Sequence, residues 1–225
     1  MLALLKLPEN TRTPEELFSE RYGLPEERTR QELREAVQLG LVHIIDKCLQ
    51  VSQVERLKLV LRCLEDGLAV ERVCQAAGWR EFEDLAAVIL GSNGYVTKKH
   101  LRFRVGAKGY EVDVLALRTP WSLVVECKRW KRSWQPSALR RVADTHRRKA
   151  SALAEALPSL SDGLDRSMHR DKKLVPVVLT LSDTPMKMKS GVPFVPISRF
   201  QSFLEEFAGY VGDLAVFSSP PKESP

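Results

Sequence analysis

Cysteine is scarce in this sequence of 225 residues, and its spacing does not suit a zinc site. The four cysteines are Cys48, Cys63, Cys74 and Cys127, and no two of them form a CxxC pair. The first three lie among apolar residues predicted to be helical, where a free cysteine acts as a small buried hydrophobe. A chain of this length buries a sizeable core without disulfides, so the sequence fits a reduced, cytoplasmic compartment.

Long hydrophobic runs are also absent, so we expect neither a membrane span nor a membrane partner. The apolar start, residues 1–7, is too short for the hydrophobic region of a signal peptide, and Pro8 and Glu9 end it. Hydrophobic residues make up 44% of the chain and charged residues 28%. That composition is typical of a globular protein and excludes a disordered chain.

The charge balance is basic, with a formal net charge of +6 and a sequence pI of about 9.2. Such a balance favours a polyanionic partner such as nucleic acid, although a soluble protein with surplus lysine and arginine explains it equally well. The position of the surplus favours the first interpretation. Between residues 128 and 149 a single acid, Asp144, faces nine cations: Lys128, Arg129, Lys131, Arg132, Arg140, Arg141, Arg147, Arg148 and Lys149.

The first third of the sequence is predicted to be all-helical. Thr13 and Pro14 resemble a helix start, with a capping threonine followed by proline and acids. A second helix is expected from Pro25 towards Leu49, with His43 in its core. A capping box at Ser52–Glu55 predicts a third helix to about residue 64, and a short helix follows over 69–77. These elements predict a helical N-terminal domain over residues 1–75.

The pattern changes after residue 79. A helix is expected over 79–90, strands over 95–105, 111–118 and 122–129, a helix over 139–157, strands over 174–181 and 192–197, and a helix from Ser198 to about 210. This αβββαβ-βα order predicts an α/β domain over 76–213, with a mixed sheet flanked by helices. The tail, residues 214–225, is rich in proline and serine and is expected to be disordered.

Two charged residues interrupt the apolar strand over 122–129. Residues two apart share a face of a strand, so Glu126 and Lys128 point the same way. Two charges on one face of a buried strand are costly unless they are paired or bind a metal ion. The alternative is that the strand ends before Glu126 and that both side chains reach water.

The preceding strand adds a second carboxylate, Asp113, between Val112 and Val114. If the two strands form a hairpin, Asp113 lies near Glu126, and the two carboxylates repel each other unless a cation sits between them. Oxygen ligands favour Mg²⁺ or Mn²⁺ over zinc. A nearby lysine, Lys128, can position an attacking water and stabilise developing phosphate charge.

A third acid lies on the helix over 79–90. Glu83 shares a helix face with Trp79, Ala86 and Leu90, beside the apolar stripe. A metal or lysine partner explains an acid in that position, and a solvated edge of the stripe explains it equally well.

These residues together resemble the PD-(D/E)xK nuclease superfamily. The motifs are Phe82-Glu83, Gly94-Tyr95, Glu111-Val112-Asp113-Val114 and Val125-Glu126-Cys127-Lys128. The likeness covers about residues 79–210 and is greatest to Mrr-type restriction endonucleases and archaeal Holliday junction resolvases. The triplet of Asp113, Glu126 and Lys128 alone occurs by chance, but the same triplet on adjacent apolar strands after a helix that carries a glutamate is more specific.

The resemblance implies a restriction-endonuclease-like fold and metal-dependent hydrolysis of DNA phosphodiester bonds. Asp113 and Glu126 would bind Mg²⁺ or Mn²⁺ with the carbonyl of Cys127, Lys128 would be the catalytic lysine, and Glu83 would complete the metal site or orient its water. Two departures stand out. Gly109-Tyr110-Glu111 replaces the proline before the aspartate. The helix over 139–157 lacks the glutamine that is common in the Mrr branch, and its nearest polar candidates are Thr145, His146 and Lys149.

Basic and aromatic residues after the motif are candidates for nucleic-acid binding. Trp130-Lys131-Arg132-Ser133-Trp134 interleaves cations with aromatics, which suits backbone contacts and stacking, although two half-buried loop tryptophans are an equal alternative. The full set of expected nucleic-acid contacts is Arg129, Trp130, Lys131, Arg132, Trp134, Arg140, Arg141, Arg147, Arg148 and Lys149. A solvated charged face is the alternative for the helical members, and we interpret the lone His146 as a surface or structural residue.

The residues described above are compatible with three functions. The leading hypothesis is a DNA endonuclease of restriction, repair or recombination type, which would act as a homodimer if it cuts two strands. The second is a non-catalytic nucleic-acid-binding module on the same fold. The third is an interaction protein that acts through its N-terminal helices. A helix-turn-helix over residues 64–77 is not favoured, because the helix that follows already supplies Glu83 to the core.

Overall fold

The computed structural model describes residues 1–7, 9–10, 13–14, 18, 23, 25–129, 135–160 and 173–219. The chain divides into two compact units, Met1–Leu85 and Ala86–Pro225. The division falls inside helix α5 (Trp79–Ser92), later than the predicted start of the second domain at residue 76. Each unit is described by itself.

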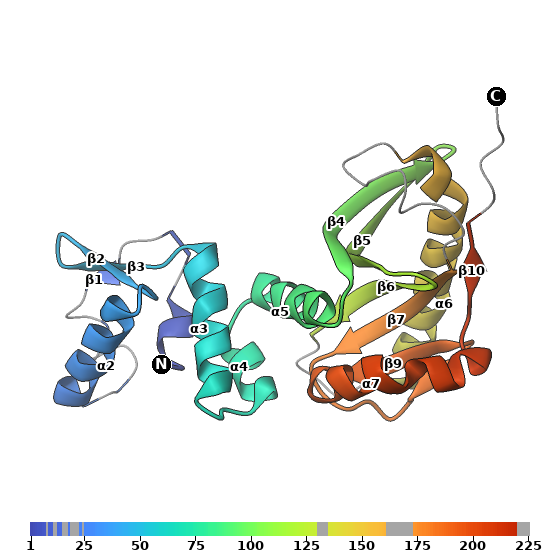
Figure 1. Ribbon diagram of the computed structural model, residues 1–225. Helices are drawn as coiled ribbons and strands as arrows, with labels where there is room; N and C mark the ends of the chain where they lie inside the picture. The colour runs from blue at the N-terminus through green and yellow to red at the C-terminus, as the bar shows by residue number, and fades with distance from the viewer. Residues whose placement is uncertain are drawn as a thin grey trace. The chain divides into compact units, whose positions relative to one another are not determined.

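The first unit combines helices with a small sheet (Figure 1). Its elements are η1 (Leu4–Lys6), β1 (Thr13–Pro14), α2 (Glu26–Gln38), β2 (His43–Ile45), β3 (Cys48–Gln50), α3 (Gln53–Glu65) and α4 (Val70–Ala76). The prediction of an all-helical segment was therefore wrong, because three strands pair in the order β1-β3-β2. The capping box of α3 is confirmed: the hydroxyl of Ser52 accepts a hydrogen bond from the main-chain N–H of Glu55, and the Glu55 carboxylate accepts one from the main-chain N–H of Ser52.

The helix predicted from Pro25 towards Leu49 ends at Gln38, and a β-hairpin follows it. Asp46 and Lys47 form the hairpin turn with φ values of 51° and 57°, the left-handed geometry that matches the twist of paired strands. Ile44 and Ile45 are β-branched and pair in the strand, where they are 41% and 44% exposed. His43, predicted to be a core residue, is instead 59% exposed on its side chain and pairs with Glu55.

Thr13 and Pro14 do not start a helix. They form β1, and Thr13 is the register partner of Leu49 in β3. Cys48 lies in β3 rather than in a helix and is partly exposed, whereas Cys63 and Cys74 are buried as expected.

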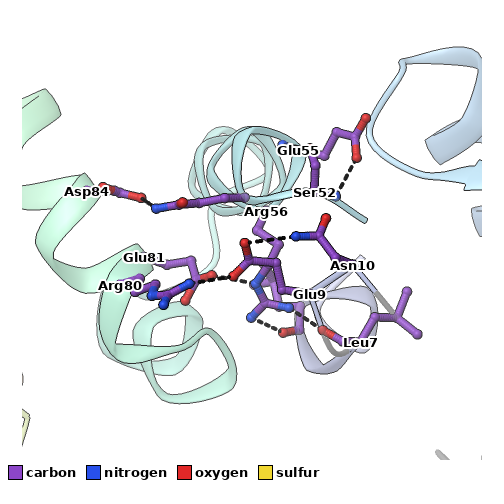
Figure 2. A network of polar contacts seen from close by, with 11 residues as sticks. Leu7, Glu9, Asn10, Ser52, Glu55, Arg56, Arg80, Glu81 and Asp84 are labelled. Carbon is purple, nitrogen blue, oxygen red and sulfur yellow. Dashed lines mark hydrogen bonds and ion pairs between the residues drawn. The ribbon is translucent and has the colours of Figure 1, made fainter. Parts of the chain in front are cut away.

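A buried arginine joins the N-terminal segment to the helices of the first unit (Figure 2). Arg56 of α3 forms an ion pair with Glu81, and their side chains are 8% and 3% exposed. The same guanidinium donates to the carbonyl oxygen of Leu7 and, at 2.9 Å, to that of Leu5. The buried charge thus has an acid partner and two further acceptors, which is what burial of a charge requires.

The second unit is built around a seven-stranded sheet. Its elements are β4 (Val96–Val105), β5 (Lys108–Leu117), β6 (Trp121–Lys128), α6 (Pro136–Ala156), η2 (Leu157–Ser159), β7 (Lys173–Thr180), β8 (Met188–Lys189), β9 (Val192–Pro196), η4 (Ile197–Arg199), α7 (Phe200–Glu206), η5 (Phe207–Asp213) and β10 (Phe217–Ser218). The strand order is β4-β5-β6-β7-β9-β8, and β10 pairs with β7. The pairs β4–β5 and β5–β6 are antiparallel, whereas β6, β7 and β9 run parallel. Strands β8 and β10 pair antiparallel with β9 and β7.

This arrangement confirms the predicted mixed sheet flanked by helices and its αβββαβ-βα order. Helix α6 packs on the sheet along its length. Ala150 and Leu153 join Leu115 and Val124 in one buried cluster, and Leu139 and Ala143 join Val178 in another. The expected disorder of the tail was wrong for Phe217 and Ser218, because their pairing with β7 orders them; residues 220–225 lie outside the described residues. No described helix is both long and apolar enough to cross a bilayer.

Candidate active site

Strands β5 and β6 lie side by side as an antiparallel pair (Figure 1). This pairing brings two carboxylates together. Val114 pairs with Val125 and Leu115 with Val124, so the same register extended by one residue sets Asp113 opposite Glu126. Val114 and Val125 are fully buried, which places the two acids next to a buried, apolar part of two interior strands. Asp113, Glu126 and Lys128 are thus brought together by the fold.

One oxygen of Asp113 is fixed by the neighbouring strand. The main-chain N–H of Cys127 donates to Oδ2 of Asp113 at 2.8 Å. Burial raises the pKa of Asp113, and the charge of Glu126 raises it further, while the N–H of Cys127 and two lysines oppose the shift. Ionised Asp113 is therefore held in an environment that disfavours its charge.

Glu126 is surrounded by nitrogen atoms. Its Oε1 accepts from Nζ of Lys128 at 2.6 Å, and its Oε2 forms an ion pair with Nζ of Lys149. The Nδ1 atom of His146 lies 3.7 Å from the same Oε2. Burial acts to raise the pKa of Glu126, but the basic side chains around it outweigh burial and lower the pKa to about 2.

His146 is a fully buried structural residue rather than a surface one. Its Nε2 lies 2.8 Å from the carbonyl oxygen of Val124, so Nε2 carries the proton and Nδ1 presents its lone pair towards Glu126. Burial, the largest effect, lowers the pKa of His146 to about 4, and the charge of Glu126 opposes that shift. Since His146 is then neutral at pH 7, the two lysines supply the positive charge that holds Glu126 ionised.

The donor set suits a hard divalent cation only in part. Two carboxylates and the carbonyl of Cys127 are oxygen ligands, and Mg²⁺ commonly binds proteins through one or two carboxylates while keeping several waters. The raised pKa of Asp113 beside Glu126 is the repulsion that such a cation would relieve. Within the described ranges, however, no group of three or more His, Cys, Asp or Glu side chains is arranged to hold a metal ion, and Glu126 already pairs with lysines.

Glu83, the fourth predicted site residue, lies in the first unit. It is 2% exposed, and its Oε1 accepts a hydrogen bond from the indole N–H of Trp79, one turn earlier in α5. Its burial shows that it is not at a solvated edge of the helix. Its role in a metal site stays a prediction.

The predicted nucleic-acid contacts fall into three groups. Trp130, Lys131, Arg132 and Trp134 lie outside the described residues, and Arg129 is partly exposed at the end of β6. Arg140, Arg141, Arg147 and Arg148 are exposed along α6. Lys149 differs from them, because its side chain is only 15% exposed and turns to Glu126.

Sequence reasoning missed the link between α6 and Glu126. His146 and Lys149 are three residues apart and so share one side of a helix, which was the available signal. Their approach to Glu126 depends on how α6 crosses β6, which no local pattern reports.

Comparisons with known proteins agree with this geometry. Residues 74–154 match the restriction endonuclease family through its Mrr catalytic domain. An uncharacterised protein of Archaeoglobus fulgidus is 29% identical over 136 residues, which cover 60% of this chain and 95% of that protein.

Two solved structures are similar at lower levels. AF1548, a protein of unknown function, has a TM-score of 0.35 at 16% identity, over 56% of this chain and 65% of that chain. Protein VC1899 from Vibrio cholerae has a TM-score of 0.41 at 10% identity, over 94% of this chain and 50% of that chain. The chain thus spans less than two thirds of each of these solved chains.

The family match covers the helix with Glu83, both strands with the carboxylates, and most of α6. Residues 74–154, the segment that holds Asp113, Glu126 and Lys128, are therefore similar to the catalytic domain of Mrr-type restriction endonucleases.

Proposed function

We propose that this protein is a metal-dependent DNA endonuclease that hydrolyses phosphodiester bonds. The observation that carries the proposal is the convergence of Asp113, Glu126 and Lys128 on two neighbouring apolar strands. These strands lie in the segment that matches the restriction endonuclease family. A charged cluster in that position costs stability, and such a cost is typical of functional sites.

In this proposal Asp113 and Glu126 hold Mg²⁺ or Mn²⁺ with the carbonyl of Cys127, and Glu83 completes the site or orients a water. The bound ion would polarise the scissile phosphate and lower the pKa of its water. The N–H of Cys127 keeps Asp113 in one orientation through Oδ2. Lys128 places its ammonium group where negative charge develops on the phosphate.

Lys149 takes a second part in this scheme. Its pairing with Glu126 compensates the carboxylate in the absence of a cation. If Glu126 held a divalent cation, the ammonium group of Lys149 would be free to contact a phosphate. His146 has no charge to release at pH 7, and its Nε2 is held by the carbonyl oxygen of Val124.

The cellular setting follows from the same proposal. DNA is the partner, the compartment is cytoplasmic, and cleavage of two strands would require a homodimer. The arginines of α6 and the residues over 129–134 would contact phosphates, with affinity that falls as salt rises.

The test compares the wild-type protein with Asp113→Ala and Lys128→Ala on plasmid, single-stranded and branched DNA, with Mg²⁺, with Mn²⁺ and with EDTA. Cleavage by the wild type that needs the metal and is lost in both variants, while binding persists, supports the proposal. Binding without cleavage by any form of the protein overturns it.

A second function is favoured by one observation. Glu126 is already paired with Lys128 and Lys149, as expected if the charges were kept for structure in a non-catalytic nucleic-acid-binding module. The two functions differ in metal binding: a catalytic site takes up Mn²⁺ in a manner that depends on Asp113, and a structural ion-pair cluster does not.

A further inference from the structure

Positive charge is concentrated in one unit of the chain. Residues 86–225 hold 23 lysines and arginines against 13 acids, whereas residues 1–85 hold 12 against 16. A polyanion would therefore meet its complementary surface on the second unit. The arginines of α6 account for only part of this excess.

Another part lies on the hairpin of β4 and β5, which none of the expected contacts includes. Cations and apolar residues alternate along β4: Lys98, His100, Arg102 and Arg104 are exposed, whereas Leu101 and Phe103 are 3% and 5% exposed. Lys108 extends the row at the start of β5. Strand β4 is at the edge of the sheet, so no further strand covers this row.

Most of this row keeps its charge available. Arg102 pairs with Glu111 at 2.8 Å, and Nδ1 of His100 lies 3.7 Å from the same carboxylate. Lys98, Arg104 and Lys108 have no carboxylate partner among the residues that the structure describes; Arg104 donates to the carbonyl of Ala107. One acid thus faces several cations along the hairpin.

The aromatic residues of the hairpin are buried or partly covered, since Nζ of Lys108 lies 5.1 Å from the ring centroid of the half-buried Tyr110. Phe103 stacks on Tyr110 with ring centroids 5.2 Å apart, and Phe103 is almost fully buried. Proteins that bind single strands usually offer exposed aromatics on which bases stack. A row of cations without such rings suits the phosphates of a duplex, which carry charge at regular intervals.

We propose that the cation row of the β4–β5 hairpin, Lys98, Arg102, Arg104 and Lys108, binds the phosphate backbone of duplex DNA away from the bond that is cut. Cations two residues apart on a regular strand are about 7 Å from each other, which is the spacing expected for Arg102 and Arg104. Between them and Lys98 the strand is irregular at His100, whose φ is 52°. The row lies mainly on β4, next to the strand β5 that carries Asp113. Arg102 of β4 is the register partner of Glu111, two residues before Asp113 in β5. The choice of DNA rests on the proposed function; the phosphate site does not.

The experiment measures duplex binding in EDTA over a range of salt concentrations, by anisotropy of a labelled random-sequence duplex. The test protein carries Lys98→Ser, Arg104→Ser and Lys108→Ser. Its matched control carries Lys187→Ser, Lys189→Ser and Arg199→Ser, which remove the same charge at the opposite edge of the sheet, near β8.

We expect the test protein to lose about 2.7 from the slope of log affinity against log salt, since each phosphate contact contributes about 0.9. Its affinity at low salt should fall about tenfold or more, while the control loses less than about one unit of slope. Equal losses in both proteins, or none in either, overturn the proposal. The row would then serve only to prevent edge-to-edge pairing of β4.

Two additions keep the result decisive. If the triple variant does not fold, the single variants Lys98→Ser and Lys108→Ser should each lower the slope by about 0.9. Competition with single-stranded DNA and with duplex RNA identifies the ligand. If the substitutions in the row weaken binding only of these two ligands, the choice of duplex DNA is overturned. If the protein does not cleave DNA but its binding still depends on the row, the proposed nuclease function is rejected and this phosphate site is retained.

Discussion

The main-chain N–H of Cys127 donates a hydrogen bond of 2.8 Å to Oδ2 of Asp113. The carboxylate thus occupies an acceptor position that a strand carbonyl would otherwise take, at the point beyond which β5 and β6 have no further register pairs. This contact fixes the orientation of Asp113 without neutralising it, because its donor is a neutral amide.

Replacement of Asp113 should separate activity from stability. In Asp113→Asn we expect cleavage to fall about a thousandfold or more, since a metal ligand is lost. The free energy of unfolding at pH 7 should rise, because the pKa of Asp113 is raised in the folded state and its ionised form is disfavoured there. Urea unfolding at pH 7 measures this. The control is Asp183→Asn, since Lys187 lowers the pKa of that exposed acid and no gain is expected. A destabilised Asp113→Asn would show that its charge is structural.

Removal of Lys149 should change metal binding. In Lys149→Met the ion pair with Glu126 is lost, and we expect Mn²⁺ to bind several-fold more tightly, because the cation no longer competes with an ammonium group. Calorimetry on folded protein gives the affinity. Arg148→Met is the matched control, being an exposed cation one residue earlier. Weaker Mn²⁺ binding in Lys149→Met would mean that this lysine organises the site rather than blocks it.

Stability should depend on His146 in mildly acidic solution. The pKa of His146 is lowered in the folded state from 6.5 to about 4, so the unfolded chain takes up the proton first as pH falls. The contribution of neutral His146 to the free energy of unfolding is fully present above about pH 6.5. It is lost between about pH 6.5 and pH 4, by up to roughly 3 kcal/mol. In His146→Gln, unfolding free energy measured in EDTA should be flat over that window. An unchanged pH dependence would contradict the assignment, and the loss below pH 4.5 from Glu126 should persist in either protein.

The buried ion pair of the first unit should be intolerant of losing one partner. Arg56→Met leaves Glu81 and the carbonyls of Leu5 and Leu7 without their donor, and we expect a cost of about 3 to 5 kcal/mol. The exposed pair of Arg80 with Glu9 is the control, and Arg80→Met should cost less than about 1 kcal/mol. Urea unfolding followed by the fluorescence of Trp79 reports on this unit. Equal costs would contradict the prediction. The double variant Arg56→Met, Glu81→Leu should recover part of the loss, because no unpaired buried charge is left.

Sequence reasoning was most accurate where local patterns decide the structure. The helix that begins after Ser52 was predictable because the capping residues act within one turn. The strands that carry Asp113 and Glu126 were predictable because their alternation and their bounding turns are local. The segment after Gln38 was misjudged, because Ile44 and Ile45 suit a helix or a strand and only pairing with β3 selects the strand.

The candidate site shows the same division between local and non-local information. Periodicity and turns along the chain were enough to predict that Asp113, Glu126 and Lys128 lie on adjacent strands. That Lys149 and His146 approach Glu126 became visible only in the folded structure, because it depends on where α6 crosses the sheet. Contacts between residues 23 and 20 positions apart are set by packing of the core, and no pattern along the chain encodes them directly.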